Sequence, residues 1–132
     1  MTKAYKDTLK ETLKQEGKLV SSNKRPYVII NDITAYIDKN FTETLKLSTL
    51  ADKFEVSSSY LSHHFKAHTG LSISRYIRLK RLGLAKKYYE SGLPLTEAAM
   101  NAGFEDYSVF YKAYRNEFGT SPTKDFAKPN ND

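Results

Sequence analysis

The sequence predicts an all-α protein in which two helix-turn-helix lobes are joined by a long linking helix, with about seven helices in all. A short helix, a tight turn and a longer helix occur twice, with the second copy 48 residues later before the turn and 49 residues later after it. Apolar residues recur at the helical spacing of three and four, and strand-like character is confined to a short run over residues 27–30.

The two copies span residues 47–70 and 95–119. In each copy the second helix is suited to entering a DNA major groove, as the recognition helix of a helix-turn-helix does. Any helical hairpin shows similar periodicity, which is the alternative interpretation. Two matched copies beside a strong basic excess favour a pair of DNA-reading helices over that alternative.

Residues 1–26 are expected to form a leader with an exposed helix over residues 2–17 and a loop before Pro26. This segment is a solvated, partly frayed helix, or else the tail of an upstream linker or a weak pairing surface. The folded domain is expected over residues 27–127, with a tail over 128–132. It divides into a first lobe over 27–71, a linking helix over 72–91 and a second lobe over 92–127.

Helix starts in the first lobe are predicted from residues that cap helices. Asn31 or Asp32 is expected to cap the first helix, which would bury Ile33, Tyr36, Ile37 and Phe41. Ser48 is expected to cap the next short helix. The three serines at residues 57–59 are expected to cap the longer helix that Gly70 ends.

The linking helix is expected to start at Ser72 and to end before Gly92, with Thr96 opening the helix that follows and Gly103 closing it. Asp106 is expected to cap the next helix, which would bury Val109, Phe110, Tyr114 and Phe118. The pair Ser121-Pro122 predicts a final short turn, because proline is favoured at the first helical position.

The chain carries 21 Lys and Arg residues against 15 Asp and Glu, a net charge of +6. Residues 57–92 alone hold seven cations and one carboxylate, so this stretch accounts for the whole excess. A concentrated basic stretch favours polyanionic partners. The seven cations are Lys66, Arg75, Arg78, Lys80, Arg81, Lys86 and Lys87.

Several classes of protein are disfavoured by what the sequence lacks. It has no Cys, no apolar run approaching the length of a membrane span and no signal-peptide core, so a reducing cytoplasmic location is expected and no membrane partner. His64, expected to be half-buried, and His68 have a zinc-compatible spacing, but no third ligand is near and no metal is expected. Without a glycine-rich phosphate loop or a nucleophile elbow, neither an enzyme nor a cofactor is expected.

Once the apolar positions are assigned to the core, polar side chains remain on the opposite faces of the two longer helices. Hydroxyl, imidazole and ammonium groups at these positions suit base edges near the helix start and phosphate further along. Tyr107 is expected to be exposed near its helix start, where it would contact a thymine methyl or a sugar. The two faces are Ser59, Ser62, His63 and Lys66, and Ser108, Tyr111, Lys112 and Arg115.

Residues 30–126 resemble the DNA-binding domain of the AraC/XylS family of bacterial transcription regulators. The most specific likeness is at residues 103–110 (Gly-Phe-Glu-Asp-Tyr-Ser-Val-Phe) and 118–122 (Phe-Gly-Thr-Ser-Pro). The first copy matches through Leu-Ala at 50–51, Val-Ser at 56–57, Tyr-Leu at 60–61, Phe-Lys at 65–66 and Thr-Gly at 69–70.

The resemblance implies that two lobes read successive major grooves. Its base-reading positions fall on Ser59, Ser62, His63, Tyr107, Ser108, Tyr111 and Lys112. Phosphate contacts are assigned to Ser57, Lys66, Arg75 and Arg115.

The sequence departs from the family pattern at three places. Glu55 stands at the first turn, where Gly would accept a positive φ, so this turn is either strained or different in shape. The first reading helix offers short or weakly basic groups where the family often has Arg. After Ser121-Pro122 the usual aromatic-Arg pair is Asp125-Phe126, which predicts a one-residue shift of the last helix.

These observations predict a sequence-specific double-stranded DNA-binding transcription regulator, an activator by resemblance, whose partners are an operator and RNA polymerase. The main alternative is a basic helical module that docks on polymerase or an acidic protein. Family members often carry an effector or dimerisation domain before this one, so the chain is expected to be either a fragment or a stand-alone regulator.

Overall fold

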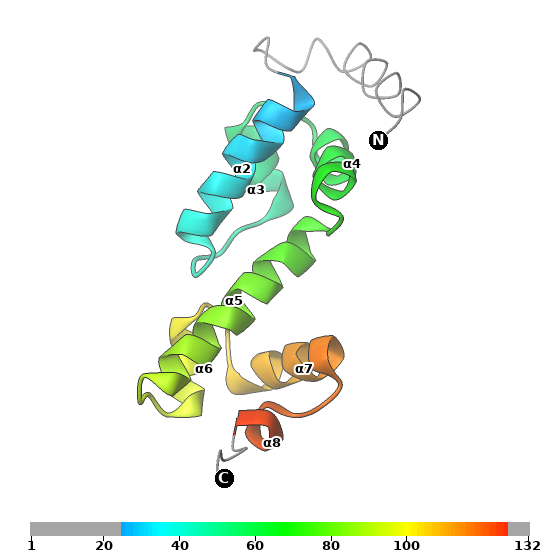
Figure 1. The fold of residues 1–132 in the computed structure, drawn as a ribbon. Coiled ribbons are helices and arrows are strands. Elements are labelled where there is room, and N and C mark those ends of the chain that lie inside the picture. Colours follow the sequence, from blue (N-terminus) through cyan, green and yellow to red (C-terminus); the bar gives the residue numbers. More distant parts are fainter. Residues whose placement is uncertain (1–24, 127–132) are drawn as a thin grey trace. The chain divides into compact units, whose positions relative to one another are not determined.

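The computed structural model of the protein describes residues 25–126, so the helix expected over residues 2–17 and the tail over 128–132 lie outside the described residues. The described residues form seven helices and no strand (Figure 1), which confirms the all-α prediction. The helices are α2 (Pro26–Asn40), α3 (Leu47–Lys53), α4 (Ser58–Thr69), α5 (Ile73–Glu90), α6 (Leu95–Asn101), α7 (Tyr107–Phe118) and α8 (Pro122–Phe126). Among them is no helix with the length and apolar character that crossing a membrane requires.

The chain forms two units, and their boundary falls within the first turn of α5. Of the described residues, the first unit contains 25–40 and Leu45–Arg75, and the second contains Phe41–Thr44 and 76–126. The second unit is therefore built from two separate stretches of sequence. Its first stretch is the loop between α2 and α3.

The first helix of the first unit starts at Pro26, six or seven residues earlier than a cap at Asn31 or Asp32 predicts. Pro26 occupies the first helical position, where its missing N–H is no loss, and the carbonyl of Arg25 accepts hydrogen bonds from the N–H groups of Val28 (3.0 Å) and Ile29 (3.1 Å). The earlier start adds Ile29 and Ile30 to the buried stripe of Ile33 and Ile37. Asn31 and Asp32 are thus interior to α2, and the expectation that either caps it was wrong.

Two further expectations for the first lobe were wrong. Phe41 lies past the end of α2, so it does not belong to the buried stripe of that helix. Ser48 lies inside α3, since the first helical hydrogen bond runs from the N–H of Leu50 to the carbonyl of Lys46 at 3.0 Å. Lys46, the residue before the helix, makes no side-chain cap. Both α2 and α3 contact α4, whose Tyr60, Leu61 and Phe65 are fully buried.

Four other helix starts are confirmed by hydrogen bonds from the backbone to the expected capping oxygen. Ser57 accepts from the N–H of Tyr60 at 3.0 Å and Ser72 from that of Arg75 at 3.2 Å. Asp106 accepts from the N–H of Val109 at 3.0 Å, and Ser121 from that of Lys124 at 3.1 Å. The prediction for α6 was one residue late, since this helix begins at Leu95 and Thr96 lies inside it.

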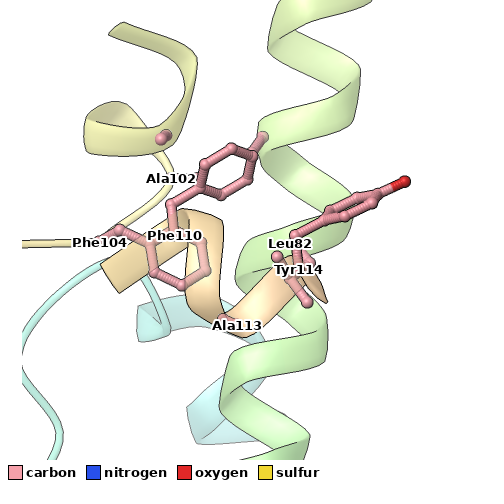
Figure 2. Packing of buried hydrophobic residues seen from close by; sticks show 8 residues of the cluster. Leu82, Ala102, Phe104, Phe110, Ala113 and Tyr114 are labelled. Atoms are coloured by element: carbon pink, nitrogen blue, oxygen red, sulfur yellow. The ribbon is translucent and has the colours of Figure 1, made fainter. Parts of the chain in front are cut away.

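The core of the second unit joins α5, α6 and α7 (Figure 2). Its buried residues are Leu82, Ala85, Ala99, Ala102, Phe104, Phe110, Ala113 and Tyr114.

Two residues of α7 that were expected in this core are exposed, namely Val109 (43 %) and Phe118 (51 %). Successive helical residues are about 100° apart, so the stripe of Phe110, Ala113 and Tyr114 turns Val109 outward. Phe118, in the last turn of α7, contacts the ring of Tyr114 at 4.6 Å between centroids while much of its surface stays exposed.

The short helix α8 is held to the second unit by the two residues that depart from the family pattern. The hydroxyl of Tyr114 donates a hydrogen bond to the carboxylate of Asp125. The ring of Phe126 stacks on Tyr89, with 5.3 Å between centroids, and meets Tyr114 edge-on at 5.2 Å. Asp125 and Phe126 therefore fasten the end of the domain to α7 and α5.

Candidate nucleic-acid interface

The two turns that precede α4 and α7 have the same backbone hydrogen bonds. In each, the turn residue donates its N–H three residues back, and the next residue donates five residues back, at 3.0–3.2 Å. The donor–acceptor pairs are Glu55 to Asp52 and Val56 to Ala51 in the first turn, and Gly103 to Met100 and Phe104 to Ala99 in the second. Both turns therefore share one hydrogen-bond pattern, although the φ values of their turn residues differ.

The matching turns impose a left-handed conformation on Glu55, whose φ is +59°. The equivalent Gly103 has a φ of +112° and carries no Cβ. For an L-residue with a side chain, the left-handed region costs roughly 1–2 kcal/mol. The first turn is thus strained, as one of the two sequence-based alternatives predicts.

The helices that follow the two turns also match. Both α4 and α7 have 12 residues, and each follows a side-chain cap, Ser57 or Asp106. Each ends at a left-handed glycine, Gly70 (φ +81°) or Gly119 (φ +75°), whose N–H donates to a carbonyl four residues back at 2.8 Å. The repeat seen in the sequence is therefore a repeat of structure.

On α4 all four residues of the predicted reading face are exposed, namely Ser59, Ser62, His63 and Lys66. The opposite side of the helix is buried. A surface hollow of about 710 Å³ lies along this face. Its lining is Leu47 of α3 and Ser58, Ser59, Ser62, His63, Lys66 and Ala67 of α4.

On α7 the predicted face is exposed at Ser108, Lys112 and Arg115, whereas Tyr111 is half-buried. Tyr107, expected to be exposed, is also half-buried. Its ring contacts those of Phe110 at 5.6 Å and Tyr111 at 6.2 Å, and burial followed by the charge of Tyr111 raises its pKa. Tyr107 thus packs against the core of the second unit and Tyr111 packs on Tyr107, so both side chains are only partly exposed.

The first turn of α7 is fixed by Asp106. Its carboxylate accepts hydrogen bonds from the N–H of Val109 and from the hydroxyl of Ser108, both at 3.0 Å, and these bonds hold its pKa below the usual range. The donor proton of Ser108 is therefore engaged, which leaves its oxygen to act as an acceptor.

Val109 is a surface residue of α7 that sequence reasoning assigned to the core. It lies beside Ser108 and one turn before Lys112 on the exposed side of the helix. An exposed apolar side chain among polar ones suits contact with a thymine methyl group. The spacing of Phe110, Ala113 and Tyr114 is the signal that could have placed Val109 outside.

The residues assigned to phosphate differ in their surroundings. Lys66 and Arg115 are exposed at equivalent places in the last turns of α4 and α7. Arg75 is exposed in the first turn of α5, and Ser57 is half-buried with its hydroxyl oxygen engaged in the cap of α4. The two cations at the helix ends are therefore the best-presented members of this set.

His64, expected to be half-buried, is fully buried behind the reading face of α4. Neither of its ring nitrogens has a hydrogen-bond partner among the described residues, and its ring lies 4.3 Å from that of Tyr60 between centroids. Burial, followed by the charges of His63 and His68, lowers its pKa to about 4. No group of three or more metal-binding side chains occurs in residues 25–126.

Comparisons with known proteins agree with this geometry. The sequence profile of the family described as a helix-turn-helix domain matches residues 50–128, more than half of the chain. The transcriptional activator RhaS of Escherichia fergusonii is 30 % identical over 109 residues, which are 82 % of this chain and 39 % of that protein. The chain thus spans about two fifths of the length of this relative and of the Msm operon regulatory protein of Streptococcus mutans.

Solved structures show the same fold. The C-terminal domain of AraT, a response regulator from Geobacillus stearothermophilus, matches with a TM-score of 0.70 and 26 % identity, over 79 % of this chain and 91 % of that one. The DNA-binding domain of the transcriptional factor AdpA, solved with a target DNA, matches with a TM-score of 0.69 and 20 % identity, over 77 % and 97 %. The chain belongs to the AraC/XylS family of helix-turn-helix transcription regulators.

Proposed function

We propose that this chain binds double-stranded DNA sequence-specifically and regulates transcription as an activator, with α4 and α7 reading two major-groove segments. The observation that carries the proposal is the equivalence of the two helices. Ser59, Ser62, His63 and Lys66 on α4 stand at the same positions as Ser108, Tyr111, Lys112 and Arg115 on α7, counted from cap to terminal glycine.

Base reading is assigned to the exposed groups in the first two turns of each helix. On α4, Ser59, Ser62 and His63 line one hollow and offer hydroxyl and imidazole groups to base edges. On α7, Ser108 offers an acceptor, Lys112 offers ammonium donors and Val109 offers a methyl contact for thymine. Tyr107 and Tyr111 contribute their exposed edges.

Phosphate contacts are assigned to cations beyond the reading positions. Lys66 and Arg115 lie one turn after the base-reading residues, where a helix in the major groove approaches the backbone. Arg75 extends the basic surface into α5, and Ser57 contributes from the start of α4. These contacts orient the domain and supply the salt-dependent part of the affinity.

The activator role draws on the relatives. The matched RhaS is named a transcriptional activator, and the matched AdpA domain was solved in complex with a target DNA. Activation implies RNA polymerase as a further partner. Because RhaS and the Msm operon regulatory protein are more than twice as long as the segment they share with this chain, the proposal also includes an effector or dimerisation domain in the whole regulator.

Two alanine variants on one face of α7 test the assignment. Lys112→Ala is expected to weaken binding to the preferred duplex by roughly 1–3 kcal/mol and to relax the preference at one base position, because a base-edge contact is lost. Arg115→Ala is expected to weaken binding to all duplexes alike and to reduce the salt slope by about one, because a phosphate contact is lost.

The measurement is a titration of each variant against operator variants with single base changes, at several salt concentrations. Thr123→Ala, at an exposed position of α8 outside the assigned base-reading and phosphate-binding residues, serves as the control and should bind as the parent does. Uniform losses for both cation variants would refute the assigned reading face. Binding of the parent to an acidic protein but not to duplex DNA would favour a protein-docking module instead.

A further inference from the structure

Arg81 of α5 ties together parts of the second unit that are far apart in sequence. Its Nε donates a hydrogen bond to the carbonyl of Phe41 at 2.6 Å, and its Nη2 donates to the carbonyl of Glu43 at 2.8 Å. Both acceptors lie in the loop between α2 and α3, which groups with the second unit. A single half-buried guanidinium therefore holds a loop that precedes it by about forty residues.

The turn before α7 closes on the same contact. A Cβ on Gly103 would lie 2.8 Å from Nε of Arg81, 2.9 Å from Cα of Thr42 and 3.0 Å from the Thr42 carbonyl oxygen. The first two distances are shorter than real Cβ contacts and the third is at their tight limit, so glycine allows the turn, the guanidinium and the loop to meet this closely. The φ of +112° at Gly103 adds a second reason for glycine at this position.

A guanidinium is suited to this role because it presents several N–H donors in a fixed plane. One ammonium group on a flexible stem does not reproduce the two directed bonds in the same geometry. The carboxylate of Glu105, two residues after Gly103, also acts on Arg81 and opposes the effect of burial, which lowers the pKa of the guanidinium. The contact thus involves the loop, α5 and the turn together.

The turn leads directly into the second reading helix. Phe104, the next residue, is buried in the core, and Asp106 caps α7. Only three residues separate Gly103 from the first residue of α7, so a displacement of the turn is passed to the helix start. The direction of α7 is consequently coupled to the position of the Arg81 contact.

We propose that Arg81 is a positioning residue for base recognition: by clamping the Phe41–Thr44 loop against the Gly103 turn, it fixes the start of α7 and sharpens sequence discrimination without contacting DNA. The inference rests on the proposed DNA-binding function. Arg81 thus has a positioning role within the second unit, in place of the general attraction to polyanions expected of the basic residues between 57 and 92.

The test uses Arg81→Met and Arg81→Lys in the full chain, with Lys87→Met as the control. Lys87 is exposed on the same helix, so its replacement makes the same change in charge without touching the contact. Each protein is titrated with the duplex selected by the parent and with all its single-base variants, at several salt concentrations. Circular dichroism and thermal unfolding of the same samples report on folding.

Both Arg81 variants are expected to lose about tenfold in discrimination at positions under α7, at the lower end of what one well-placed base contact supplies. Discrimination under α4, the salt slope and the helix content should stay as in the parent. Gly103→Ala should give the same selective loss, and the double variant should be no worse than the single ones, because both changes open one contact.

Other outcomes would overturn the inference. A uniform loss of affinity with a salt slope reduced by about one would make Arg81 a phosphate contact. Unchanged discrimination in both variants would leave Arg81 without a role in base recognition. Discrimination retained in Arg81→Lys would mean that only the positive charge matters. Loss of the second unit's helices in both variants would make Arg81 a stability residue. If the parent protein bound all duplexes equally, the proposed sequence-specific function itself would be wrong. This result differs from a loss of discrimination that is confined to the Arg81 variants.

A measurement without DNA addresses the contact itself. The Nε proton of Arg81 should exchange slowly with solvent in the parent, because it is bonded to the Phe41 carbonyl. In Gly103→Ala the same proton should exchange at least tenfold faster, since the added Cβ displaces the guanidinium. Equal exchange rates in the two proteins would contradict the clamp directly.

Discussion

Replacing the buried His64 by leucine should make the first unit resistant to mild acid. The imidazole is fully buried, and its pKa is lowered from 6.5 to about 4, so in the folded protein it stays neutral well below the pH at which the unfolded chain binds a proton. Stability from a lowered histidine pKa is fully present above pH 6.5 and is lost as pH falls from 6.5 toward 4.

The size of the effect follows from the two pKa values. Because the unfolded chain binds the proton more readily, the folded state loses about 2 kcal/mol of stability at pH 5 and about 3 kcal/mol at pH 4, relative to neutral pH. His64→Leu removes this dependence and also removes two buried nitrogens that have no partner among the described residues. The variant should therefore gain about 2 kcal/mol on the parent when pH falls from 7.5 to 5.

Urea unfolding at both pH values measures the gain, and amide hydrogen exchange along α4 assigns it to the first unit. Ser62→Ala is the matched control, because Ser62 is an exposed residue of the same helix without a titratable group, and its replacement should leave the pH profile of unfolding as in the parent. If His64→Leu and the parent lost stability in parallel between pH 7.5 and 5, the buried neutral imidazole would be the wrong explanation.

Three further substitutions probe the two turns and the second cap. Glu55→Gly should stabilise the first unit by about 1 kcal/mol in urea unfolding by relieving the left-handed φ of +59°, whereas Glu55→Ala, which keeps a Cβ, should not. Gly103→Ala should lower the thermal stability of the second unit by about 2 kcal/mol or more, from a positive φ together with contacts under 3.0 Å, and unchanged melting would be contrary evidence. Asp106→Asn should weaken the pH dependence of the free energy of unfolding. The pKa of the Asp106 carboxyl is lowered in the folded protein, so the ionised group stabilises the fold at pH values above the usual carboxyl pKa. This stabilisation is lost as pH falls through the lowered pKa of the folded state.

The sequence predictions that were correct depend on interactions between residues close together in the chain. Ser57, Ser72, Asp106 and Ser121 each accept the hydrogen bond expected of a helix cap, since a capping side chain acts on the backbone only three residues away. The double helix-turn-helix fold could be predicted for the same reason, as its two copies are punctuated by turn and cap residues at matched spacing.

Features that depend on distant contacts could not be predicted. The two hydrogen bonds of Arg81 end on backbone carbonyls of Phe41 and Glu43, and such acceptors leave no mark on the residue types of the loop. Val109 is a different case: it was placed in the core by its residue type, although the local spacing of Phe110, Ala113 and Tyr114 already turns it outward. The early start of α2 was likewise missed because burial of Ile29 and Ile30 outweighs the caps at Asn31 and Asp32.

Selection of bound fragments from a random duplex pool by the full chain, followed by footprinting on the enriched sequence, tests the central claim most directly. Two equivalent reading helices predict two recognised major-groove segments on one face of the duplex, about one helical turn or roughly 34–36 Å apart. Base changes under α7, where Lys112 and the Gly103 turn lie, should cost more affinity than those under α4. Enrichment of no sequence at all, or a footprint confined to a single groove segment, would contradict the account.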